Sequence, residues 1–260
     1  MSSYSDTDPI STTRIDVFDQ FEYDWKEYAG TCVISELDKD MNAGEGQKFA
    51  LLPAKMENLR MSMKAQKNSD MYSDGTGNSS KTIGGLQLLV STTPTTGTAG
   101  GINRANFSFW RNHQTSGAQT STAFDNLRST MTSIYNLCSN GVGSMHPSFW
   151  VTTRTAFQGY EGLLTANERF TDKEKPDAGF KNEKIKFKGA MGSYDNDNPS
   201  GNLYFLNEKF LKLVYKKGSW MKGRAVVNPA NQTIDVFLVR SMCNMITTNA
   251  RRLGVVSAIT

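Results

Sequence analysis

The sequence predicts a mixed α+β protein, and three observations support that class. Apolar residues spaced three and four apart mark two helices within the first 140 residues. A third helix is predicted to start near residue 153. From residue 183 onward the pattern changes to short runs that alternate between apolar and polar residues, which is typical of β-strands. With 260 residues, of which 38% are hydrophobic and 10% aromatic, the chain is long and apolar enough to build a packed core.

The first 25 residues favour an extended limb. Most of their apolar side chains fall on odd positions, as in a half-buried strand: Ile15, Val17, Phe21, Tyr23 and Trp25. Phe18 breaks this alternation. At ~3.3 Å per residue such a segment spans roughly 80 Å, and few turn signals interrupt it. We expect a projecting limb of a hairpin, whose aromatic side chains need a neighbouring molecule to cover them.

Residues 29–36 are expected to form a strand, and a long helix is predicted from about Asn42 to Tyr72. Its apolar stripe, at alternating spacings of three and four, consists of Phe49, Leu52, Met56, Leu59 and Met63. Gly75 is a fitting stop, and Pro53 is expected to kink the helix or to mark a later start. About 28 helical residues span ~40 Å, whereas a compact chain of this size has a radius of gyration of only ~18 Å. The helix is therefore expected to cross the whole molecule with its stripe packed in a core.

Residues 76–122 are rich in Gly, Ser, Thr and Asn. Within them, residues 83–91 (IGGLQLLVS) are expected to form a short buried strand or turn. The segment 102–112 is aromatic and basic, with Phe107 and Phe109 between its arginines. It fits either a loop that touches nucleic acid or a loop held on the core by its own side chains. We favour the second interpretation, with Arg104, Trp110 and Arg111 as anchoring residues.

The rest of the chain alternates helices and strands. A second amphipathic helix is predicted from Phe124 to Cys138, a strand at 147–153, and a third helix from Thr153 or Thr155. Further strands are expected within 184–189, 202–217, 224–227 and 233–242. The turn 194–201 holds Asp195 and Asp197, a spacing that suits a cation. The turn lacks the twelve-residue loop and closing Glu of an EF-hand, so an Asx or Pro turn is the better interpretation.

The sequence contains no recognisable catalytic, cofactor-binding or metal-binding set. The three cysteines lie far apart without a CxxC pair, which argues against a disulfide framework or a zinc ribbon. His113 and His146 are the only histidines, too few for a metal site or a catalytic base. Glycine-rich nucleotide loops, HExxH and GxSxG are absent. No apolar run reaches ~18 residues, and the start MSSYSDTDPI lacks the features of a secretory signal. We therefore expect neither a membrane partner nor secretion.

Lysines gather in two places, at 181–188 and at 209–222. In a strand, Lys184, Lys186 and Lys188 would share one face, and such a face suits a polyanion. An ordinary solvated strand face explains the same pattern and is our preferred interpretation. The formal charge of +4 is too small to indicate sequence-specific recognition of nucleic acid.

The order of several short motifs is more informative than any one of them. YDWKEYAGTCVISELD and NAGEG lead into the long helix, which ends at MYSDGTG (71–77). IGGLQLLVS (83–91), GGINRANFSFWRN (100–112), HPSFWVTTRTAFQGYEGLL (146–164) and YDNDNPSGNLYFLNEKFLKLV (194–214) follow. In this order, from about Trp25 onward, the sequence resembles the major capsid protein of tailed double-stranded-DNA phages, the family with the Hong Kong 97-type fold.

The resemblance implies a division of the chain. Residues 1–28 would be the later limb of an extended loop that lies over a neighbouring subunit, so Met1 would fall in the second limb. Residues 29–77 and 203–242 would form a peripheral domain, with a spine helix at 43–74 and a β-hairpin. Residues 78–202 and 243–260 would form an axial domain. The candidates for contact between subunits are Phe18, Phe21, Tyr23 and Trp25.

The resemblance also implies a function. The chain would be a structural protein, not an enzyme, that assembles with copies of itself as pentamers and hexamers into an icosahedral shell. The shell would enclose double-stranded phage DNA in the virion after assembly in the host cytoplasm. Portal, scaffold or decoration proteins would be further partners.

Three alternatives remain open at this point. A nanocompartment shell of the encapsulin type has the same fold and would hold an enzyme instead of DNA. A nucleic-acid-binding module would use the lysine faces and the FWRN loop, and would bind DNA with a steep dependence on salt. An unrecognised hydrolase is the third alternative and ranks last.

Overall fold

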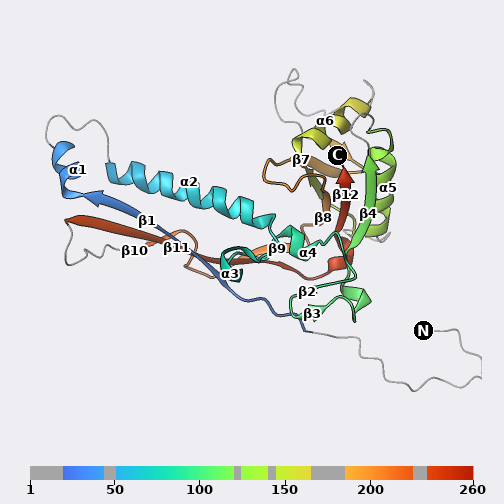
Figure 1. Cartoon of the computed structure of the whole chain (residues 1–260), viewed down its shortest axis with the longest axis horizontal. Helices are drawn as coiled ribbons and strands as arrows, with labels where there is room; N and C mark the ends of the chain where they lie inside the picture. Colours follow the sequence, from blue (N-terminus) through green and yellow to red (C-terminus); the bar gives the residue numbers. More distant parts are fainter. Residues whose placement is uncertain are drawn as a thin grey trace, which may run out of the picture.

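The computed structural model describes residues 20–43, 51–119, 124–139, 145–164, 185–224 and 233–259. They form two regions of different build (Figure 1). One is a long projection, here called the arm, which consists of strands β1, β9, β10 and β11 with helices α1 and α2. The other, here called the head, is a six-stranded sheet covered by helices α5 and α6.

The helices are α1 Glu36–Met41, α2 Leu51–Met71, α3 Gly77–Ser80, α4 Leu86–Leu89, α5 Leu127–Cys138 and α6 Arg154–Leu163. Short 3-10 helices lie at Ser108–Trp110, Phe124–Asn126 and Ala250–Arg252. The strands are β1 Lys26–Ser35, β2 Thr98–Ala99, β3 Ile102–Asn103, β4 His113–Gln119, β5 Phe149–Thr152, β6 Lys186–Phe187, β7 Ala190–Tyr194, β8 Leu203–Leu206, β9 Leu211–Tyr215, β10 Lys222–Arg224, β11 Ile234–Thr247 and β12 Gly254–Ile259.

The arm is a narrow antiparallel sheet with one helix on one face. β1 pairs with β11 along its whole length, from Lys26 opposite Cys243 to Ser35 opposite Ile234. On the far side of β11, β10 and β9 each pair with it. Helix α2 lies so close to β1 that a side chain on Gly30 would come within 2.8 Å of Leu59. A glycine in the strand therefore lets the helix approach the sheet.

The head sheet has the order β4-β12-β8-β5-β7-β6 and buries both of its faces. Alternate residues of β8 and β12 divide between two apolar clusters, as the period of two in a strand requires. Phe205 and Val256 pack with α5 and α6, whereas Tyr204 and Val255 pack with α4 and the end of α2. The first cluster is aromatic at its centre, where the Trp150 ring lies 5.6 Å from Phe157 between ring centroids.

β11 joins the two regions. Its last residues pair with β9 at the base of the arm. The chain then passes through one 3-10 turn into β12, which lies inside the head sheet between β4 and β8. The two regions are thus linked both by this continuous run and by the C-terminal end of α2.

Most helices lie where the periodicity predicts them. α5 and α6 are confirmed, and the Thr153 hydroxyl caps α6 by accepting from the backbone N–H of Ala156. The described part of α2 spans Leu51–Met71 and includes Pro53 near its N-terminal end. Phe49 and the rest of residues 44–50 lie outside the described residues.

Other predictions need correction. Residues 83–91 contain the short helix α4 and no strand: Leu86 and Leu89, three residues apart, are both buried. A run this short carries too little periodicity to distinguish the two structures. Gly85 is required before α4, because a side chain there would collide with the backbone oxygens of Asp70 and Met71. Residues 20–25 form no strand, and β4 is a strand that the sequence analysis did not predict.

Two further elements differ from expectation. Helix α1 directly follows β1, and Ser35 caps it by accepting from the backbone N–H of Asp38 at 3.1 Å. The expected peripheral segment 203–242 begins too early, because β8 pairs with β5 and β12 in the head sheet. The hydrophobic run 203–206 is buried on both faces, as a central strand requires.

Candidate assembly surfaces

One face of the arm sheet has no helix over it. In β1, Cys32 and Ile34 are buried toward α2, whereas Val33 between them is 46% exposed. Val33 lies opposite Val236 of β11, and Thr31 lies opposite Leu238. Because opposite residues of an antiparallel pair share a face, Val33, Val236 and Leu238 form an apolar strip beside the Thr31 side chain. We call this side of β1, β10 and β11 the outer face; Figure 1 shows α2 on the other side of the sheet.

The tip of the arm is also apolar. Leu37 and Met41 of α1 are 65% and 71% exposed. α1 buries no residue, although Lys55 of α2 reaches its Asp38 carboxylate at 3.2 Å. An amphipathic helix with an uncovered apolar side is typical of a surface that another molecule covers.

The four aromatic candidates at the start of the chain do not share one environment. Phe18 lies outside the described residues. The Phe21 ring stacks on Trp110 of its own chain, with centroids 5.8 Å apart and planes at 17°. Tyr23 packs against Gly100 of the same loop, and burial raises the pKa of its hydroxyl. Trp25 is 49% exposed. Of the described candidates, Trp25 is therefore the most exposed, ahead of Phe21 at 37%.

The three loop residues singled out by the sequence make close contacts within the chain. Arg104 is 2% exposed and donates to the backbone oxygens of Leu88 and Leu89 at the end of α4, at 2.6 and 3.0 Å. The Trp110 indole donates to Ala99, and Arg111 donates to the backbone oxygen of Arg104. Burial lowers the pKa of the Arg104 guanidinium. These bonds hold the loop on α4, and Phe107 and Phe109, 40% and 44% exposed, project from it.

The buried stripe of the long helix α2 continues beyond its apolar residues into buried polar ones. Leu59 and Met63 face β1 as predicted, and Met56 approaches Gly223 of β10. The next stripe positions are the polar residues Lys67 and Asp70, 3% and 8% exposed. The sequence analysis missed them, because polar residues at stripe positions weaken the apolar signal.

Lys67 and Asp70 have different partners. The Lys67 amine lies 4.1 Å from the centre of the Trp220 ring and 5.6 Å from that of Tyr28. Burial lowers its pKa. Asp70 accepts from the Tyr28 hydroxyl at 2.7 Å and from Gln66 at 3.0 Å. A cation over aromatic faces and a fully bonded carboxylate thus fix α2 on the sheet.

The joint between arm and head is polar. Asn68 of α2 donates to the carboxylates of Asp195 and Asp197 in the turn after β7, at 3.1 and 2.7 Å. The Tyr72 hydroxyl donates to Asp195 at 3.1 Å. The backbone N–H of Asp197 also donates to the Asp195 side chain, which is the Asx turn that the sequence favoured. An adjacent pocket of about 290 Å³ is lined mainly by apolar residues, among them Tyr72, Phe149 and Met245.

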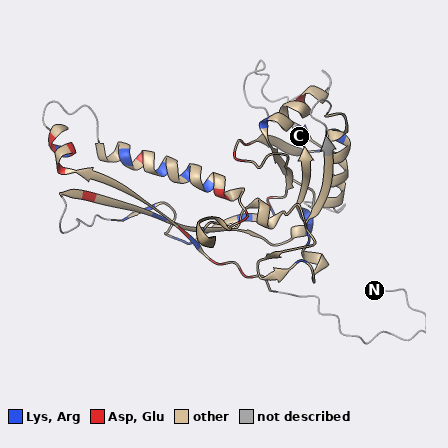
Figure 2. Cartoon of the chain, viewed as in Figure 1, with Lys and Arg blue, Asp and Glu red and all other residues tan. Residues whose placement is uncertain are grey.

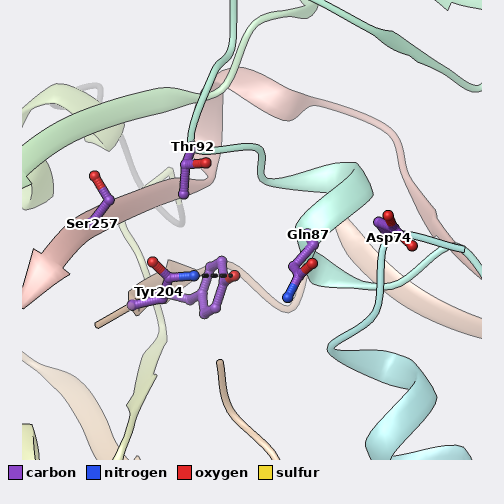
Figure 3. A pocket seen from close by; sticks show the side chains of 6 residues that line it. Asp74, Gln87, Thr92, Tyr204 and Ser257 are labelled. Carbon is purple, nitrogen blue, oxygen red and sulfur yellow. Dashed lines mark hydrogen bonds between the residues drawn. The ribbon is translucent and has the colours of Figure 1, made fainter. Parts of the chain in front are cut away.

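The largest described pocket does not resemble an active site. It measures about 540 Å³ and is lined by polar side chains: Asp74, Gln87, Thr92, Asn202, Tyr204 and Ser257 (Figure 3). Asn202 donates to the Tyr204 hydroxyl at 3.3 Å, and burial raises the pKa of Tyr204 to about 12. Ser257 accepts from Gln114, not from a base. These lining residues thus include no general base beside a nucleophile.

The cysteines and histidines give no catalytic pair among the described residues. Cys32, Cys138 and Cys243 are buried free thiols. Burial raises the pKa of Cys138 to about 12, so its side chain stays a protonated thiol, which is a poor nucleophile. Burial, together with Arg251 and Arg252, lowers the pKa of His113.

Metal-binding and membrane-spanning features are likewise missing from the ranges that the structure describes. No group of three or more His, Cys, Asp or Glu side chains gathers there in a way that would hold a metal ion. None of the described helices has the length and the apolar character that crossing a bilayer requires.

Comparison with known proteins identifies the fold. No family model and no curated protein sequence matches the chain. Among solved structures, the capsid of cyanophage A-1(L) is similar at a TM-score of 0.68 with 15% identity, over 90% of this chain and 77% of that one. The capsid of myovirus phage XM1 is similar at 0.58 with 9% identity, over 90% and 74%.

The same arrangement occurs outside phages. The SrpI encapsulin of Synechococcus elongatus PCC 7942 is similar at a TM-score of 0.58 with 12% identity, over 91% of this chain and 75% of that one. These neighbours are structural shell proteins, and most are capsid proteins of tailed phages. The chain has the Hong Kong 97-type fold that its motif order implied.

Proposed function

We propose that this chain is the major capsid protein of a tailed double-stranded-DNA phage. In this proposal copies of the chain associate as pentamers and hexamers, close an icosahedral shell around DNA, and remain in the virion after assembly in the host cytoplasm. The arm would act as the peripheral domain and the head as the axial domain. Such a role requires no catalytic residue, so we propose that the chain is not an enzyme. Portal, scaffold and decoration proteins are further proposed partners.

The observation that best supports this proposal is the uncovered outer face of the arm. A sheet with one face buried under α2 and an apolar strip on the other is expected to bind a second molecule. Stable subunit contacts bury on the order of 1,600 Å², and a long, flat arm offers more surface than a compact domain of equal mass. Identical subunits that share several such contacts close into a shell.

The experiment is assembly of the full chain and of a variant with a charge on the outer face. The wild-type chain is expected to form closed particles by size-exclusion chromatography and negative-stain microscopy. Val33→Asp is expected to abolish particles, because Val33 lies opposite the apolar Val236 and burying an unpaired carboxylate there costs several kcal/mol. The matched control is Met61→Asp on the solvent side of α2, where Met61 is 58% exposed. Normal particles from Val33→Asp, or a strictly monomeric wild-type chain, would contradict the proposal.

A second candidate function is an encapsulin-type nanocompartment shell. It is favoured by the likeness to the SrpI encapsulin, whose solved structure is a holo complex. The contents of purified particles distinguish the two functions. Nuclease-protected DNA of uniform length supports the capsid, and a single co-purifying cargo protein supports the nanocompartment.

A further inference from the structure

A basic pocket lies on the arm, away from the joint and the head. It measures about 300 Å³ and is lined by Lys216, Gly218, Ser219, Lys222, Arg224, Arg240 and Met242. These residues come from the turn between β9 and β10 and from the two strands β10 and β11. Four of the seven lining residues are cationic, and none is acidic. Figure 2 shows where Lys and Arg occur on the strands of the arm.

The strand register places the cations on the outer face. Lys222 lies opposite Arg240, and the backbone N–H of Lys216 donates to Met242. Val239 and Cys243, which alternate with Arg240 and Met242, are fully buried on the α2 side. Lys222 and Arg240 therefore point to the side of the sheet that α2 does not cover, further along β11 from the tip of the arm than the Val33–Val236 pair of the proposed subunit contact.

The cations in this pocket are only partly neutralised by the described residues. Arg240 pairs with the Glu27 carboxylate across the strands. Lys216, Lys222 and Arg224 take part in no ion pair with the described part of the chain. Like charges gathered around one pocket repel one another, so an anion in the pocket would be favourable.

The segment that supplies most of the pocket residues carries a local excess of positive charge. Residues 203–224 carry six Lys or Arg residues and one Glu, which gives +5, whereas the entire chain has a formal charge of +4. The remainder of the chain is therefore at −1. A local excess of this kind attracts a polyanion even when the overall charge is small.

The lining indicates which part of a nucleic acid the pocket would contact. The exposed aromatic residues nearby, Tyr215 and Trp220, lie on the α2 side: Tyr215 is opposite the buried Cys243, and Trp220 contacts Lys67. The pocket thus has cations and the Ser219 hydroxyl but no aromatic surface for stacking a base. This combination suits the phosphates of a duplex, whose bases are already stacked.

We propose that this pocket holds a phosphate of a double-stranded nucleic-acid backbone, with Lys216, Lys222 and Arg224 as the neutralising groups. The inference rests on the proposed function and adds the place at which the shell subunit contacts the DNA. Recognition through phosphates is independent of base sequence, as packaging of a whole genome requires.

The test uses a fluorescein-labelled 20-base-pair duplex at nanomolar concentration. The full chain is titrated into it, and binding is measured by anisotropy between 50 and 200 mM salt. The double variant Lys222→Ala/Arg224→Ala is expected to reduce the salt slope by about 2 and to weaken binding roughly five- to tenfold per lost contact, equally for two unrelated sequences. The control is Lys64→Ala, an exposed lysine of α2 without an ion pair among the described residues. It should have a smaller effect.

Two outcomes would overturn the proposal. One is an unchanged slope in the double variant, or an equal loss in the control. The other is a loss of poly-glutamate binding without a loss of duplex binding, which would assign the pocket to an acidic protein segment. Particle formation is scored separately by microscopy. If particles form but the salt slope of the double variant is unchanged, only the proposed phosphate site is refuted. If the double variant loses DNA binding but the wild-type chain never assembles, only the proposed shell function is refuted.

Discussion

The arm and the head use the same kinds of elements but treat the two faces of their sheets differently. The head sheet carries an apolar cluster on each face, so nearly every large side chain of its central strands is buried. The arm sheet is covered by α2 on one face and leaves Val33 and its neighbours exposed on the other. The head therefore contains its own core, whereas the arm is complete only when another molecule covers its outer face.

The difference has an energetic consequence. Burial of apolar surface contributes roughly 25 cal/mol per Å², so a region covered on one face gains less from its own folding than a region covered on both. We expect the arm to open at lower free energy than the head in the isolated chain. Assembly would then bury the apolar surface of the outer face and so add to the stability of the arm.

The largest expected effect comes from the head core. Trp150 is fully buried between Phe157 and Tyr160, so Trp150→Ala leaves a large cavity and is expected to cost about 3–5 kcal/mol in unfolding free energy. Urea denaturation followed by circular dichroism measures it. Trp25→Ala is the matched control: it removes the same side chain from a site that is 49% exposed. Equal losses in both variants would show that the head is not the core of the molecule.

A smaller effect is expected at the joint. Asn68→Ala removes the amide that bridges Asp195 and Asp197, and leaves the two carboxylates facing each other. The expected cost is about 1–2 kcal/mol. Hydrogen exchange should increase at the C-terminal end of α2 and at residues 195–198 before it increases in β8. Asn68→Ala/Asp197→Ala should recover part of the loss because it removes one of the repelling charges. No recovery would contradict this account of the joint.

Sequence reasoning predicted the elements in which periodicity and burial coincide. Leu127, Met131, Ile134 and Cys138 recur at helical spacing, and all four are fully buried in α5. The same reasoning missed α4, because four residues are too few to show a period. It also placed residues 203–206 with the peripheral segment 203–242, because an apolar run of this kind does not reveal which sheet it joins.

The polar contacts could not be predicted from the sequence for a different reason. The bond between Asn68 and Asp197 joins residues 129 positions apart, and the local spacing around either residue does not indicate the other. The basic pocket combines three segments in the same way. Its lysines were visible as a cluster at 209–222, but only the pairing of β10 with β11 places Arg240 beside Lys222. Which strands are neighbours is decided by the tertiary fold, not by local spacing.

The smallest expected effect concerns Lys67, on the side of the arm sheet that α2 covers. Lys67 is a buried cation whose pKa is lowered by burial. Between that lowered pKa and the ordinary value near 10.4, the unfolded chain binds a proton that the folded chain has released, so this residue makes stability rise with pH in that window. Lys67→Met keeps the volume and removes the charge. It is expected to change the unfolding free energy at pH 7 by less than about 1 kcal/mol, because the lost cation–π contact offsets the relieved burial.

The decisive measurement is the difference in unfolding free energy between wild type and Lys67→Met, taken from pH 7.5 to pH 10.5. Lys67 lowers the pKa of the nearby Cys243 thiol, so both proteins carry Cys243→Ala, and the difference then isolates Lys67. The protein with Lys67 should gain stability relative to the variant as pH rises. A constant difference would show that the Trp220 ring compensates the buried charge fully. The arm would then be held at its base by a cation that costs nothing to bury, and its weakness relative to the head would lie only in its uncovered outer face.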